Sequence, residues 1–87
     1  MTASSPLFLG KTPVGVTVRI VALELEVDFV EWLRAVGIHE GERITVLRHA
    51  LFGGPIHVRT GSGGEFALNR ELAHSIQVVP AESETRA

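Results

Sequence analysis

The chain is dominated by short runs in which apolar and polar residues alternate, and most of these runs are bounded by glycine, proline or a polar turn. The clearest runs cover residues 14–23, 44–48, 56–60 and 65–68. Alternation with a period of two places every second side chain on one face, which is typical of a strand with one buried face. With a last apolar run at 76–79, the sequence predicts about five short strands.

The period changes to three and four between the first two predicted strands. Apolar side chains recur at these spacings over residues 27–36, Gly37 follows as a C-cap, and Asp28 lies near the start, where a carboxylate favours the helix dipole. We therefore expect one short helix here. A single helical turn is expected through Ala73, because the side chain of Asn69 is suited to accept from the amides that follow it.

A length of 87 residues suits one domain with one modest core. A flat sheet of this size would expose two edges, so we expect the strands to close, or nearly close, into a small barrel. The predicted class is therefore all-β, with the short helix inserted after the first strand and the helical turn placed before the last. The domain is expected to cover residues 7–79, between flexible ends at 1–6 and 80–87.

The composition excludes several classes of function. The chain has no cysteine, which rules out a disulfide framework, a thiolate zinc site, an iron–sulfur cluster and a cysteine nucleophile. No apolar run approaches the roughly 20 residues that span a bilayer, and no signal peptide is evident, so we expect a cytoplasmic protein without membrane insertion. The net charge is −2 and the basic residues are scattered, which argues against nucleic acid as a partner.

An enzyme is not expected. The glycine-rich segment 61–64 is not a phosphate loop, because no helix with lysine and serine or threonine follows it at the required spacing. The serines of the chain lack any signature that would place a base and an oxyanion hole beside them. The carboxylates Glu24, Glu26, Asp28 and Glu31 are interpreted as a solvated helix start.

The second and third predicted strands are expected to pair as a hairpin. Its inner face would carry Ile44, Val46, Ile56 and Val58. For these residues to share one face, the residue numbers of each directly opposed pair must sum to an even value. A bulged or five-residue connection satisfies this condition, for example by pairing Arg48 with Val58. Ala50 would then pair with Ile56.

This register suggests one hypothesis for a metal site. His49 and His57 would face each other on the outer side of the hairpin, with their Cβ atoms about 5 Å apart. Two imidazoles suit zinc, iron or nickel, but a site needs further ligands, and only His39 or a loop carboxylate offers one. The interpretation we favour is two solvated strand histidines and no cofactor. A divalent transition metal held by this pair is the alternative.

Three longer segments carry a resemblance to a known family. Residues 33–44 read LRAVGIHEGERI, residues 50–56 read ALFGGPI and residues 66–78 read FALNRELAHSIQV. Together with the opening segment 7–20, they resemble the FeoA family in order along nearly the whole chain. The resemblance implies an SH3-like barrel, a cytoplasmic location, and association with the cytosolic GTPase domain of a FeoB-like membrane transporter. It assigns no catalytic residues.

The candidate partner-binding residues lie mainly in one loop. They are Leu51, Phe52, Gly53, Gly54 and Pro55. Large apolar side chains at a glycine-flanked loop tip lose contact with water when a partner covers them. The alternative is that Phe52 folds back and plugs an open end of the barrel. Trp32 is a further candidate on the predicted helix, where we expect it to join the core, with a position at the rim as the alternative.

Two hypotheses of function follow. The leading one is a non-catalytic cytoplasmic accessory protein of ferrous iron uptake, which binds and modulates a FeoB-type membrane GTPase transporter. The alternative is a metal-responsive sensor or carrier module that binds Fe(II) or another divalent transition metal, because similar barrels occur as appended domains of iron-dependent repressors. The sequence leaves open whether the chain forms a homo-oligomer.

Overall fold

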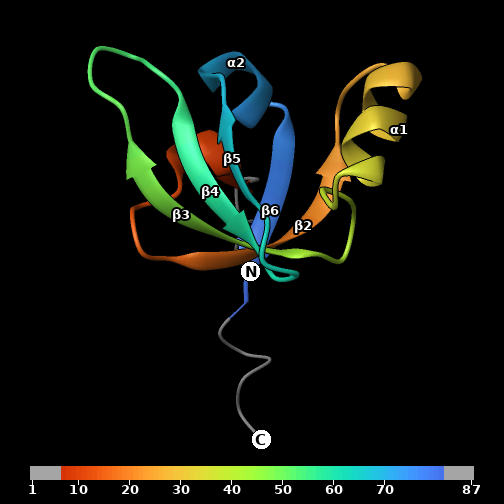
Figure 1. Ribbon diagram of the computed structural model, residues 1–87, viewed down its shortest axis with the longest axis horizontal. Coiled ribbons are helices and arrows are strands. Elements are labelled where there is room, and N and C mark those ends of the chain that lie inside the picture. The colour runs from red at the N-terminus through yellow and green to blue at the C-terminus, as the bar shows by residue number, and fades with distance from the viewer. Residues whose placement is uncertain (1–6, 82–87) are drawn as a thin grey trace, which may run out of the picture.

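The fold is a single strongly curled antiparallel sheet with two short helices (Figure 1). The computed structural model describes residues 7–81. The elements, in chain order, are β1 (Leu7–Phe8), η1 (Leu9–Lys11), β2 (Thr17–Leu23), α1 (Val27–Ala35), β3 (Arg43–His49), β4 (Ile56–Thr60), β5 (Glu65–Leu68), α2 (Arg70–Ala73) and β6 (Ile76–Pro80). The six strands pair in the order β1-β6-β2-β3-β4-β5, which confirms the predicted all-β class.

The core is the inner face of this curled sheet. Ile44 and Val46 of β3 are completely buried, and so are Ile56 and Val58 of β4, which confirms the predicted inner face of the hairpin. Alternate residues of the other long strands and the single buried residue of α1 complete it. The largest buried side chains are Leu9, Ile20, Leu33, Ile38, Ile44, Val46, Ile56, Val58, Ile76 and Val78.

The two outer strands of the sheet, β1 and β5, are not paired with each other. Instead, the 3-10 helix η1 after β1 packs against α2, which follows β5. The approach is close, since a Cβ on Gly10 would lie 2.0 Å from Cδ2 of His74. This contact joins the two ends of the curled sheet, so the barrel is completed by side-chain packing rather than by hydrogen bonds between strands.

Both helices follow the signals in the sequence. The helix α1 ends in two backbone hydrogen bonds, from Gly37 N to Arg34 O at 3.1 Å and from Ile38 N to Leu33 O at 2.9 Å. With Gly37 at φ +101°, this is the Schellman arrangement, and glycine fits it without steric cost. At α2, Oδ1 of Asn69 accepts from the backbone N–H of Leu72 at 2.7 Å, which confirms the predicted cap.

The predicted register of the β3–β4 hairpin is wrong beyond Val46. Up to the pair of Val46 with Val58, the numbers of paired residues sum to an even value, as expected. Beyond this pair the register shifts, and Arg48 pairs with His57. The expected pairs of Arg48 with Val58 and of Ala50 with Ile56 are therefore absent from the ladder. A bulge was expected in the connection, but it lies inside β3, because the extra residue is taken up there and the turn itself stays tight.

The first and last predicted strands differ in their bounds from the strands of the structure. β1 and η1 were not predicted, because elements of two and three residues are too short to show a period. The strand expected from residue 14 begins at Thr17, since Gly15 turns the chain with φ +87°. At the other end, β6 includes Pro80, and Ala81 is buried. The flexibility expected of residues 1–6 and 82–87 concerns positions outside the described residues.

Neither of the helices between residues 7 and 81 is long and apolar enough to cross a membrane.

Replacing Ile44 with alanine is expected to lower the free energy of unfolding by about 2 to 5 kcal/mol, because the side chain is completely buried and its loss leaves a cavity. Urea unfolding followed by circular dichroism measures the change. The control is Val27→Ala, at a position that is 69% exposed, where the change should stay within about 0.5 kcal/mol. Equal losses in both variants would contradict the assigned inner face.

Candidate partner-binding surface

The connection between β3 and β4 is a tight turn at Leu51–Gly54. The backbone N–H of Gly54 donates to the carbonyl of Leu51 at 3.1 Å, and the two central residues both have positive φ, +58° for Phe52 and +73° for Gly53. These are the features of a type I′ turn, which suits the twist of a hairpin. Asparagine and glycine favour such φ values, whereas phenylalanine does not, so Phe52 is held in a strained conformation.

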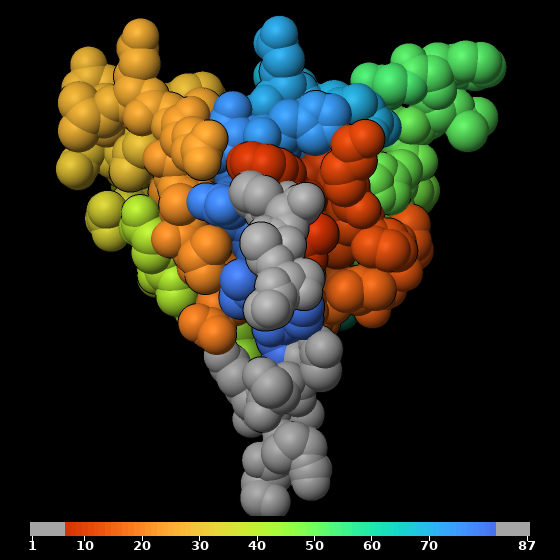
Figure 2. Space-filling model, turned by 180° about the vertical axis from the view of Figure 1, so that it is seen from behind, coloured from red at the N-terminus to blue at the C-terminus, as the bar shows by residue number. Residues whose placement is uncertain are grey.

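Phe52 points entirely into solvent. Its side chain is 100% exposed and that of Leu51 is 78% exposed. Of the two interpretations open from the sequence, the one in which Phe52 plugs the barrel is therefore wrong. The one in which the exposed tip binds a partner stays a prediction. In Figure 2 this loop, in green, is one of the outermost projections of the molecule, on the opposite side from α1.

The turn is anchored at its base. The N–H of Ala50 donates to the carbonyl of Pro55 at 2.9 Å, and Nη2 of Arg70 in α2 donates to the carbonyl of Gly54 at 3.1 Å. A Cβ on Gly54 would lie only 2.9 Å from the Cβ of Ala50, so the chain packs too closely there for a side chain. The apolar tip is therefore carried on a fixed base, connected to α2.

Trp32 does not join the core, contrary to the prediction. It is 59% exposed and lies beside Phe29, with 6.1 Å between the ring centroids and 45° between the ring planes. The reason is the narrow contact of α1 with the barrel, since Leu33 is its only fully buried residue. Trp32, one position earlier, falls at the edge of the buried stripe. With Phe29 it gives α1 an exposed aromatic pair.

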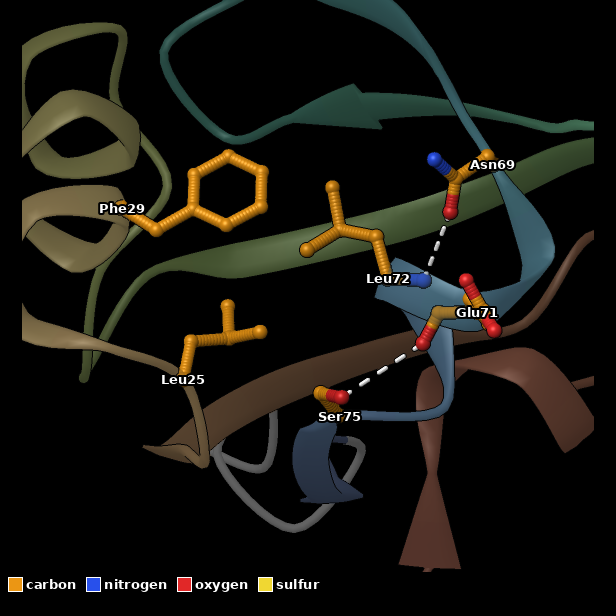
Figure 3. A pocket seen from close by; sticks show the side chains of 6 residues that line it. All are labelled: Leu25, Phe29, Asn69, Glu71, Leu72 and Ser75. Carbon is orange, nitrogen blue, oxygen red and sulfur yellow. Dashed lines mark hydrogen bonds between the residues drawn. The ribbon is translucent and has the colours of Figure 1, made fainter.

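A groove of about 350 Å³ runs between α1 and α2 (Figure 3). Its lining residues are Leu25, Phe29, Asn69, Glu71, Leu72 and Ser75. In Figure 3 Phe29 extends from α1 toward Leu72 of α2, with Leu25 beside them. This groove was not predicted from the sequence. Its two walls are some 40 residues apart in sequence, and no local pattern shows that they meet.

The two histidines of the metal hypothesis do not meet. His49 pairs with Ile56, which is fully buried, and directly opposed residues share a face, so His49 lies on the inner side of the sheet. There its Nε2 lies 2.8 Å from the carbonyl of Thr12. His57 neighbours Ile56 and therefore takes the outer face. The bulge in β3 is the physical reason, because one extra residue reverses the faces beyond it.

No other cluster replaces this pair. Within residues 7–81, no group of three or more histidine, cysteine, aspartate or glutamate side chains is placed to hold a metal ion. The histidine pair offered as a metal site is therefore not assembled, while the absence of a cofactor stays a prediction.

The fold and this surface define an SH3-like barrel that presents apolar side chains at one end, on α1 and on the β3–β4 turn. The chain belongs to the FeoA family, since the model of the FeoA domain matches residues 8–80. This family is linked to ferrous iron transport. No match is found among curated proteins.

Solved structures share the fold. The FeoA protein of Chlorobium tepidum is 24% identical, with a TM-score of 0.78 over 85% of this chain and 70% of that one. Iron(II) transport protein A of Clostridium thermocellum is 29% identical, with a TM-score of 0.79 over 87% of this chain and 46% of that one. The zinc complex of FeoA from Stenotrophomonas maltophilia, described as a prokaryotic SH3 domain protein, is 22% identical, with a TM-score of 0.68 over 83% and 88%.

Replacing Phe52 with asparagine is expected to raise the free energy of unfolding by about 0.5 to 1 kcal/mol. Asparagine tolerates positive φ, and a fully exposed ring contributes no burial that would be lost. Urea unfolding measures the change. Leu51→Asn is the matched control, because this neighbour is also exposed but lacks the positive φ, and its stability should change little. A loss of stability in Phe52→Asn would contradict the strained turn.

Proposed function

We propose that this chain is a non-catalytic accessory protein of ferrous iron uptake, which acts in the cytoplasm by binding the cytosolic GTPase domain of a FeoB-type membrane transporter. Membership of the FeoA family supports the link to ferrous iron. The candidate contact surface is the β3–β4 turn, with Leu51 and Phe52 at its tip, together with the exposed face of α1.

The observation that carries the proposal is the state of Phe52. The ring is fully exposed and its backbone has φ +58°, so it gains no burial and carries a conformational cost. Such strain persists only where the surroundings enforce it, and here the base of the turn is held by Arg70 and by the Ala50–Pro55 hydrogen bond. The turn is organised to present this ring rather than to stabilise the domain.

The energetics suit a binding role. Burying a phenylalanine side chain contributes about 1.5 to 3 kcal/mol, and a few aromatic anchors of this kind commonly dominate an interface. Because the tip is already fixed by hydrogen bonds at its base, a partner that covers Phe52 does not have to order the loop first. Leu51, beside it, extends the apolar contact area.

Changing Phe52 to aspartate is expected to weaken binding to the GTPase domain of the cognate FeoB-type transporter by at least about tenfold. The exposed ring that the partner would bury is lost, and a charge is left in its place. Isothermal titration calorimetry with the purified domain measures the affinity. Aspartate also tolerates positive φ, so the variant should fold normally.

The control for this titration is Val14→Asp, which introduces the same charge at an exposed valine between η1 and β2. Its affinity should stay within about twofold of that of the unchanged chain. Undiminished binding by Phe52→Asp, or no binding by the unchanged chain, would contradict the proposed function.

A further inference from the structure

The groove between α1 and α2 has an apolar floor and an acidic surround. Leu25, Phe29 and Leu72 supply the apolar side chains (Figure 3). Phe29 is 41% exposed although it lies at the centre of this contact, so its outer edge is open to water. Trp32 extends the apolar surface along α1, beyond the lining residues.

One carboxylate lines this groove, and three further exposed carboxylates lie next to its lining residues in the sequence. Glu71 lines the groove itself. Glu24 and Glu26 flank the lining residue Leu25 in sequence, Asp28 directly precedes Phe29, and all of them are exposed. The backbone N–H of Glu24 donates to the carbonyl of Ser75, another lining residue, at 2.8 Å, which places Glu24 at the edge of the groove.

Among residues 7–81, the groove lining holds a carboxylate and no basic side chain. The two arginines of the flanking helices are engaged in other directions, Arg34 of α1 with Glu40 at 3.8 Å and Arg70 of α2 with the carbonyl of Gly54. An occupant that brings positive charge together with apolar side chains would complement both features.

We propose that this groove binds a basic amphipathic helix of the protein partner. The apolar side chains of that helix, at positions i, i+3 and i+4, would contact Phe29 and Leu72, and its lysine or arginine side chains would face the carboxylates. This inference rests on the proposed function, and it adds the chemistry of the partner segment. It concerns a surface separate from the turn at Phe52, so the two contacts are open to independent tests.

The geometry favours a helix over a membrane as the occupant. The groove lies between two helices, and its volume of about 350 Å³ is at the small end of the range for pockets, enough for a few anchoring side chains. The headgroups of anionic lipids would be repelled by Glu24, Asp28 and Glu71, whereas a cationic peptide would be attracted.

The test is a titration of the full chain with a synthetic 14-residue peptide of leucine and lysine, in which leucine recurs at helical spacing. Trp32 is the only tryptophan of the chain and lies beside Phe29, so its fluorescence reports on the groove directly. The expected result is a saturable blue shift that weakens as salt is added. A peptide of the same composition in scrambled order, and one of leucine and glutamate, should bind at least about tenfold more weakly.

Charge variants locate the binding site. Glu71→Gln should weaken binding of the leucine–lysine peptide about threefold, and the double variant Glu71→Gln with Asp28→Asn about tenfold, because each removes one exposed charge pair. Glu65→Gln is the matched control on β5, outside the groove, and should leave the affinity unchanged. Equal weakening by the control, equal binding of the scrambled peptide, or no saturation would overturn the inference.

The failure of this inference and that of the proposed function are distinguishable. If the GTPase domain binds in a manner that needs Phe52 while the groove variants and the peptide have no effect, the groove inference fails and the proposed function stands. If the peptide binds as expected and the GTPase domain does not, the inference about the groove stands and its link to that transporter is refuted.

Discussion

The burial of one row of side chains in the β3–β4 hairpin is the constraint on which the rest of the structure depends. Ile44, Val46, Ile56 and Val58 are all completely buried. A slip of one residue in the pairing of β3 with β4 would therefore expose part of this row to water. The bulge after Val46 then leaves the inner row intact and rotates the end of the hairpin. The tight turn beyond the bulge consequently carries Phe52 outward rather than over the core.

The exposed apolar side chains and the strained turn, which do not stabilise the domain, lie at the same end of the molecule. The β3–β4 turn, α2 and α1 lie at one end in Figure 1 and Figure 2, with α2 between the other two. The hydrogen bond from Arg70 to the carbonyl of Gly54 connects α2 to the turn, and residues of both α2 and α1 line the groove. A domain of 87 residues has a small core, yet it leaves Trp32, Leu51 and Phe52 largely exposed and Phe29 41% exposed. A partner that covers this end explains both the exposed area and the strained turn.

Local patterns were sufficient to predict most of the fold. The strands β4 and β5 match their predicted bounds, and α1 and the cap at Asn69 follow from spacing and side-chain chemistry that act within a few residues. The errors arise where distant segments decide the outcome. The register beyond Val46 depends on where the extra residue is accommodated, and the exposure of Trp32 depends on how narrowly α1 meets the barrel. The loop tip was predicted because its residues are consecutive in the sequence, whereas the groove was not, because its walls come from distant segments.

The central claim is that the end formed by α1, α2 and the β3–β4 turn is the binding surface of the domain. Chemical-shift mapping of the 15N-labelled chain, titrated with the cytosolic GTPase domain of a FeoB-type transporter, the proposed partner, tests this most directly. The account predicts that the largest shifts fall on residues 51–54, α1 and α2, with the outer face of β2 and β6 unaffected. Shifts concentrated on β2 and β6, or no shifts at saturating concentration, would contradict it.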